Sequence, residues 1–105
     1  MYSQEGNYKN AITEYENFAS RYWRSSLLPV AFVEIGDAYF NLQKYDKALQ
    51  YYQKVLLNYP QHSAIYNALK GIEYVYGIQE KNEVARKIIA EFYLEHPEMK
   101  RGNDN

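Results

Sequence analysis

The sequence predicts an all-α chain built from repeated helix–turn–helix units. Apolar residues recur every three or four positions, as at Phe32 and Ile35, and this spacing is typical of an amphipathic helix. Short polar segments such as NLQKYD separate the apolar runs. Ala11, Ala48 and Ala85 lie 37 residues apart, which indicates an internal repeat. The same shift aligns several further residues: Tyr2, Tyr39 and Tyr76; Tyr8 and Tyr45; Phe18, Val55 and Phe92; Pro60 and Pro97.

The units are expected in a fixed order within one domain, residues 1–97, of about two and a half repeats. Residues 1–25 form a partial unit that keeps its second helix and only the end of its first. Residues 26–62 and 63–97 each form a full unit of two helices joined by a short turn. Proline closes each full unit because it cannot continue a helix. Residues 98–105 are expected to be a polar, frayed tail.

Local signals refine these boundaries. Ser26 and Ser63 stand where an N-cap is needed for the first helix of each full unit, and Pro29 falls in a first turn, where proline is tolerated. Gly36 interrupts a helical run at a cost of about 1 kcal/mol relative to alanine. We interpret it as a packing residue that faces Ala48 on the second helix and lets the two helices approach closely.

Composition excludes several classes of function. The net charge is −1 and no basic stripe is present, so a nucleic-acid partner is not expected. The longest apolar run is too short to span a bilayer, so direct membrane insertion is not expected. His62 and His96 have no second metal ligand at helical spacing, and neither a nucleophile motif nor a phosphate loop occurs. We therefore predict no enzyme activity, no catalytic or metal-binding residues and no cofactor.

The second unit resembles the tetratricopeptide repeat, a helix–turn–helix module that stacks into a superhelix. The resemblance rests on these residues: Phe32, Ile35, Gly36, Tyr39, Tyr45, Ala48, Tyr52, Val55 and Pro60. The third unit follows the pattern but has Glu73 where a small residue is expected. The resemblance implies a right-handed superhelix. It also implies packing roles for the following residues: Gly36, Tyr39, Ala48, Tyr52, Pro60, Ala85 and Pro97.

The resemblance further implies a concave groove, lined by the first helix of each unit, that binds a peptide or helix of another protein. Carried over position by position, its lining residues are Val33, Asp37, Phe40, Asn41, Asn67, Lys70, Tyr74 and Ile78. Within this set, Phe40, Tyr74 and Ile78 are expected to form an apolar strip edged by Asp37 and Lys70. The alternative interpretation is that the aromatic residues pack against neighbouring helices.

Two other functions remain open at this point. In the first, the chain is a structural or self-association segment of a longer envelope protein, with a homodimer formed through the incomplete N-terminal unit. In the second, it is a regulatory domain of a larger enzyme or sensor. The 37-residue units and the NYPQHS junction are similar to those of bacterial envelope proteins, namely the outer-membrane assembly lipoprotein and the Tol-Pal-associated periplasmic protein. This similarity slightly favours a periplasmic or envelope location over the cytoplasm.

Overall fold

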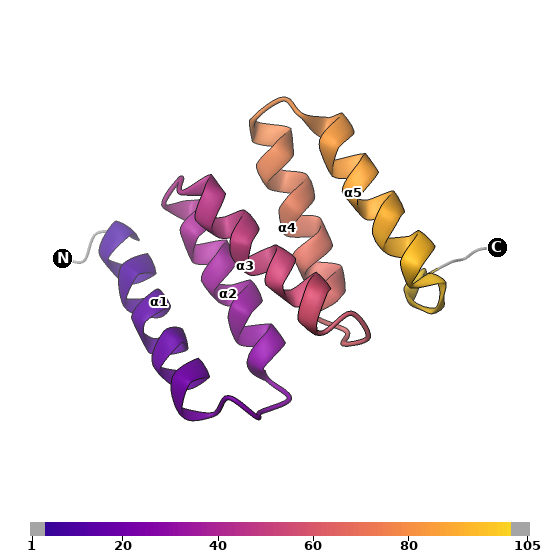
Figure 1. The fold of residues 1–105 in the computed structure, drawn as a ribbon. Helices are drawn as coiled ribbons and strands as arrows, with labels where there is room; N and C mark the ends of the chain where they lie inside the picture. The colour runs from indigo at the N-terminus through magenta and orange to yellow at the C-terminus, as the bar shows by residue number, and fades with distance from the viewer. Residues whose placement is uncertain (1–3, 102–105) are drawn as a thin grey trace.

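A computed structural model describes residues 4–101, and these residues fold into five α-helices and one short 3-10 helix, with no β-strand among them (Figure 1). The elements are α1 (Gln4–Arg21), α2 (Leu28–Asn41), α3 (Tyr45–Asn58), α4 (Ile65–Ile78), α5 (Asn82–Glu95) and η1 (Pro97–Met99). Of the repeated residues, Tyr2 lies outside the described part of the chain.

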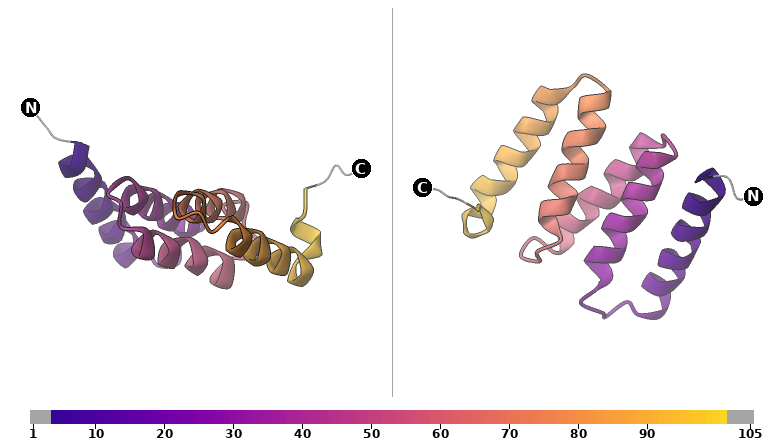
Figure 2. Two further views of the ribbon diagram at one scale, coloured as in Figure 1. Left: turned by 90° about the horizontal axis from the view of Figure 1, so that it is seen from above. Right: turned by 180° about the vertical axis from the view of Figure 1, so that it is seen from behind.

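The helices stack in chain order. Each packs on the next, and α2 also contacts α4. Figure 2 shows α2 and α4 in one layer, with α3 and α5 in the other. The α2–α3 pair packs more extensively than the α4–α5 pair. The predicted fold class, an all-α stack of helical repeats, is confirmed. No described helix combines the length and the apolar character needed to cross a membrane.

The α2–α3 turn and the α4–α5 turn have the same backbone geometry. The backbone N–H of Lys44 donates to the Tyr39 carbonyl over 2.9 Å, and the N–H of Lys81 donates to the Tyr76 carbonyl over 2.7 Å. In each turn the residue before the lysine adopts the left-handed conformation, with φ of 62° at Gln43 and 59° at Glu80. A 37-residue period therefore holds for backbone geometry as well as for sequence.

Tyr52 is the centre of the core and is 1 % exposed. A Cβ placed at Gly36 of α2 would lie 2.7 Å from Cε1 of Tyr52, and one placed at Gly71 of α4 would lie 2.3 Å from its Cζ. The nearest neighbour of Gly36 is thus the Tyr52 ring and not Ala48, which corrects the pairing expected from the sequence. Two glycines on different repeats leave the space that one aromatic ring fills.

The expected N-caps at Ser26 and Ser63 are wrong. Neither α2 nor α4 has a side-chain cap at its N-cap residue. Instead, Ser25 Oγ accepts the N–H of Leu27 over 3.0 Å, and His62 Nδ1 accepts the N–H of Ala64 over 3.0 Å. Pro29 lies in the first turn of α2, as predicted.

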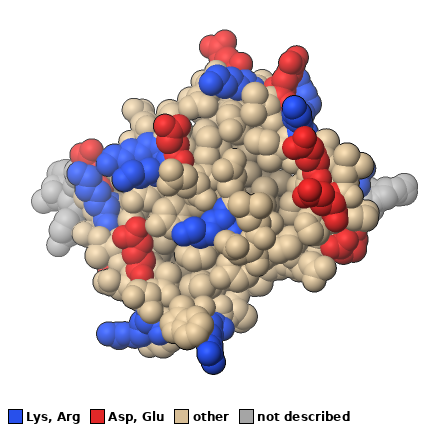
Figure 3. Space-filling view, in the orientation of Figure 1, with Lys and Arg blue, Asp and Glu red and all other residues tan. Residues whose placement is uncertain are grey.

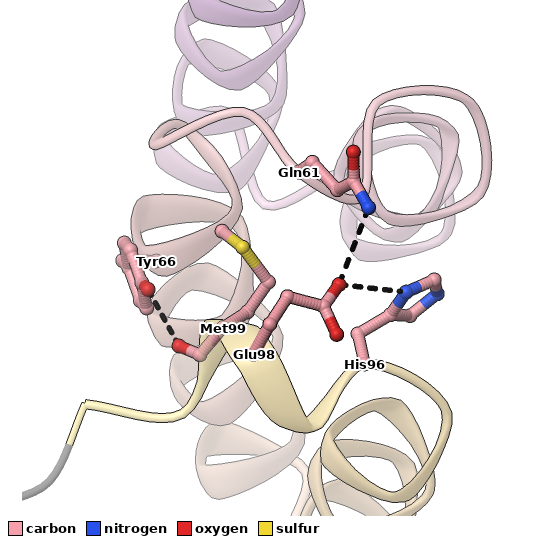
Figure 4. Close-up of polar contacts among 5 residues, drawn as sticks. All are labelled: Gln61, Tyr66, His96, Glu98 and Met99. Atoms are coloured by element: carbon pink, nitrogen blue, oxygen red, sulfur yellow. Dashed lines mark hydrogen bonds and ion pairs between the residues drawn. The ribbon is translucent and has the colours of Figure 1, made fainter.

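The described part of the C-terminal segment folds back onto the repeats, which differs from the frayed tail expected for residues 98–105. Tyr66 donates its hydroxyl hydrogen to the Met99 carbonyl over 2.5 Å, and Gln61 donates to Glu98 over 3.4 Å (Figure 4). The Arg101 guanidinium lies 3.6 Å from the centre of the Tyr66 ring. Residues 102–105 lie outside the described range.

Candidate functional site

The structure divides the eight predicted groove residues into two groups. Val33 is 5 % exposed and belongs to the core, which corrects its assignment to the groove. Phe40 is half-buried, and its ring centre lies 5.7 Å from that of Tyr45. Asp37 is also half-buried and accepts a hydrogen bond from Tyr52. The side chains of these three residues therefore take part in packing or hydrogen bonding within the fold. The remaining five are exposed: Asn41, Asn67, Lys70, Tyr74 and Ile78.

Asp37 is bound to the core through Tyr52, whose hydroxyl donates to Asp37 Oδ1 over 2.5 Å. Burial raises the pKa of Asp37 above its ordinary value of 3.8, and the hydrogen bond from Tyr52 acts in the opposite direction. Burial and the nearby Asp37 also raise the pKa of Glu34 above 4.5. Burial and the bond to Asp37 raise the pKa of Tyr52 as well. Asp37 therefore links α2 to the buried Tyr52 of α3 through a hydrogen bond.

Tyr74 and Ile78 are the apolar residues of the predicted groove that remain open, at 59 % and 57 % exposed. They lie one helical turn apart on α4 and therefore on the same side of it. They line a hollow of about 400 Å³ together with residues of α5, including Ala85 and Arg86. The hollow is formed by the two helices of the third repeat, whereas the resemblance placed the binding strip across the first helices of two repeats.

Sequence reasoning missed a second surface, which lies between α3 and α5. A groove of about 530 Å³ is lined by Gln53, Leu56, Leu57, Ile88, Glu91, Phe92, Leu94 and Glu95. Leu57 and Leu94 are 79 % and 81 % exposed. The 37-residue shift that aligns these two leucines was the available signal, because apolar residues at one repeated position suggest a shared surface. In Figure 3 the middle of this face carries few charged groups.

The described residues show no group of three or more histidine, aspartate or glutamate side chains placed to hold a metal ion. Some of their polar side chains make hydrogen bonds within the fold. Tyr51, for example, donates its hydroxyl hydrogen to Glu16 over 3.1 Å, and burial together with that carboxylate raises the pKa of Tyr51 to about 12. The hollow between α4 and α5 and the groove between α3 and α5 both carry exposed apolar side chains, which suit protein contacts.

Comparison with known proteins supports this interpretation. Residues 29–62 match the model of the tetratricopeptide repeat, which covers about a third of the chain and corresponds to α2, α3 and the turn that follows them. No curated protein and no solved structure matches the chain. Tetratricopeptide repeats generally mediate protein–protein interactions and are typically non-enzymatic scaffolds. The chain thus matches the tetratricopeptide repeat at residues 29–62, within an all-helical stack in which α1 packs on one side of the matched pair and α4 on the other.

Proposed function

We propose that this domain binds a peptide or helix of a partner protein along the exposed side of α4. The observation that carries the proposal is the pair Tyr74 and Ile78, which are more than half exposed on one helix side and continue into the hollow beside α5. This spacing places both side chains on one side of α4, where they can contact the apolar face of a bound amphipathic helix. Lys70 and Asn67 extend the same side of α4 with polar groups.

The experiment is selection of peptides from a displayed library on the whole chain, followed by affinity measurement on variants. Tyr74→Ser and Ile78→Ser should each weaken the selected peptides about tenfold or more, because exposed aromatic and aliphatic anchors supply most of such binding energy. Both variants should keep the wild-type unfolding midpoint, since neither residue is buried. Leu57→Ser is the matched control, because it removes an exposed apolar side chain from another surface. Undiminished binding to the α4 variants would refute the proposal.

A second candidate function is self-association through α1, and one comparison between repeats favours it. Ala48 and Val55 of α3 are completely buried, whereas Ala11 and Phe18, the residues at the same positions of α1, are only half-buried. The side of α1 that a preceding helix would cover is therefore partly open. Under this proposal, Ala11→Glu abolishes a dimer that light scattering detects for the wild-type chain.

A further inference from the structure

The connection between α1 and α2 presents a compact apolar and basic tip, defined here as residues 21–27. Tyr22, Trp23 and Leu27 are 51 %, 63 % and 57 % exposed. Arg21 and Arg24 are also exposed, and the Arg24 guanidinium lies 4.5 Å from the centre of the Trp23 ring. A cation held over an indole face presents charge and apolar area together. The tip thus resembles the aromatic and arginine anchors that dominate protein interfaces.

The tip is held in place by hydrogen bonds. The N–H of Tyr22 donates to the Phe18 carbonyl, and the N–H of Ser25 donates to the Tyr22 carbonyl, both over 2.8 Å. His62 Nε2 lies 2.9 Å from the Ser26 carbonyl and ties the tip to the next connection. A preorganised surface loses less conformational freedom on binding than a mobile loop does.

The groove between α3 and α5 has the complementary character. Leu57 and Leu94 stand at its edges, and the buried ring of Phe92 contributes to its lining. Glu91 and Glu95, one turn apart on α5, give this side of the groove two exposed acidic groups. Figure 3 shows a column of acidic side chains along the side where α5 lies.

Comparison with the preceding repeat explains why this groove is open. At the positions of Ile88 and Glu91, the preceding unit has Tyr51 and Lys54. The Tyr51 hydroxyl reaches across to Glu16 of α1, and Lys54 Nζ lies 5.0 Å from the centre of the Tyr51 ring. Tyr51 thus bridges α1 and α3, and Lys54 covers its ring, whereas the shorter Ile88 and the acidic Glu91 line an open groove between α3 and α5.

We propose that the tip of one copy of this chain docks into the α3–α5 groove of a second copy. Apolar surface meets apolar surface, and the arginines of the tip face the two glutamates of the groove, which provides charge complementarity. In Figure 1 the α1–α2 connection forms the lower end of the molecule, and the C-terminal ends of α3 and α5 lie above it and to the right. Because each copy carries one tip and one groove, two copies can exchange them reciprocally around a two-fold axis.

The tip is a short segment, so we expect a small contact and a weak association that depends on concentration. An interface below about 1,200 Å² is typical of transient complexes, and we expect a dissociation constant on the order of 0.1 mM. Because charge contributes, raising NaCl from about 0.05 M to about 0.5 M should weaken the dimer.

The test measures the mass of the whole chain by sedimentation equilibrium up to about 1 mM. Arg24→Glu should weaken dimerisation about tenfold or more, and so should the double change Glu91→Lys with Glu95→Lys. Mixing these two variants should restore association, because each supplies the charge that the other lost. Trp23→Ser should weaken the dimer without a change in the circular dichroism spectrum. Lys44→Glu, an exposed charge reversal in the α2–α3 turn, is the control that should leave the dimer intact.

Three results would overturn the proposal: a monomer at every concentration, a dimer that Arg24→Glu leaves unchanged, or a mixture of the charge-reversed variants that stays monomeric. A dimer lost only in Ala11→Glu would assign self-association to α1 instead. Peptide binding at Tyr74 and Ile78 is tested separately, because neither residue belongs to the tip or to the groove.

Discussion

The side chain of Tyr52 on α3 packs directly against the backbone of Gly71 on α4. The Tyr52 ring lies where a side chain at Gly71 would begin, so that a Cβ there would be 2.3 Å from the ring carbon Cζ. The ring cannot move aside easily, because Gly36 of α2 lies against the same ring and Tyr52 is 1 % exposed. This contact joins the two repeats through one side chain.

Gly71→Ala should therefore destabilise the domain, although alanine is the better helix former. The gain in helix propensity is about 1 kcal/mol. Overpacking at so close a contact should cost about 2–3 kcal/mol, so we expect a net loss of about 1–2 kcal/mol. Urea denaturation measures this loss.

Gly77→Ala on the same helix is the control for this prediction. A Cβ at Gly77 would meet only Asn82 Oδ1 at 3.5 Å, which is ordinary contact. This variant should be stabilised by up to about 1 kcal/mol. If Gly71→Ala were as stable as the wild type, the Tyr52 ring would not be confined between the two glycines.

The repeat period predicted the helices and their turns, but it could not predict this contact. The 37-residue shift pairs Gly36 with Glu73, yet the ring of Tyr52 reaches Gly71 on the next repeat. A contact between repeats depends on how far one unit rotates against the next, and a pattern within one unit does not contain that rotation. The burial of Val33 has the same origin, because α4 packs on α2.

Surface features were predicted least well. Tyr74 and Ile78 are exposed, in agreement with a surface role. The 37-residue shift aligns Leu57 with Leu94, but it does not show that a groove lies between them. Whether an apolar residue on a helix is buried depends on which neighbouring helix covers it. The replacement of Tyr51 and Lys54 by Ile88 and Glu91 matters only once α3 and α5 are known to lie side by side.

Asp37→Asn should flatten the dependence of stability on pH. The folded chain holds the pKa of Asp37 above its ordinary value of 3.8. Between these two pKa values the folded state binds more protons than the unfolded state, so stability falls as the pH rises above about 4. The asparagine variant lacks this carboxyl, and it also removes the charge that raises the pKa of Glu34. Unfolding free energies measured from about pH 3 to pH 7 test this expectation.

Tyr52→Phe should have the opposite effect on the same curve. Without the hydroxyl, the half-buried Asp37 carboxylate loses its donor, and the hydrogen bond that lowers its pKa is gone. We expect a loss of about 1.5–3 kcal/mol near pH 7 and a smaller loss near pH 3, which steepens the decline. Parallel curves for this variant and for Asp37→Asn would contradict the pairing of the two groups.

His62 joins the α1–α2 connection to the α3–α4 connection through its two ring nitrogens. The N–H of Ala64 donates to Nδ1 over 3.0 Å, so Nε2 carries the ring proton and donates to the Ser26 carbonyl over 2.9 Å. His62→Ala removes both hydrogen bonds and should lower the free energy of unfolding by about 1–3 kcal/mol.

Ser63→Ala is the informative control. A serine N-cap at this position would be worth about 1 kcal/mol, whereas α4 has no side-chain cap, so this variant should match the wild type in urea denaturation. A larger loss for Ser63→Ala than for His62→Ala would assign the cap to the serine and leave the histidine a peripheral contact.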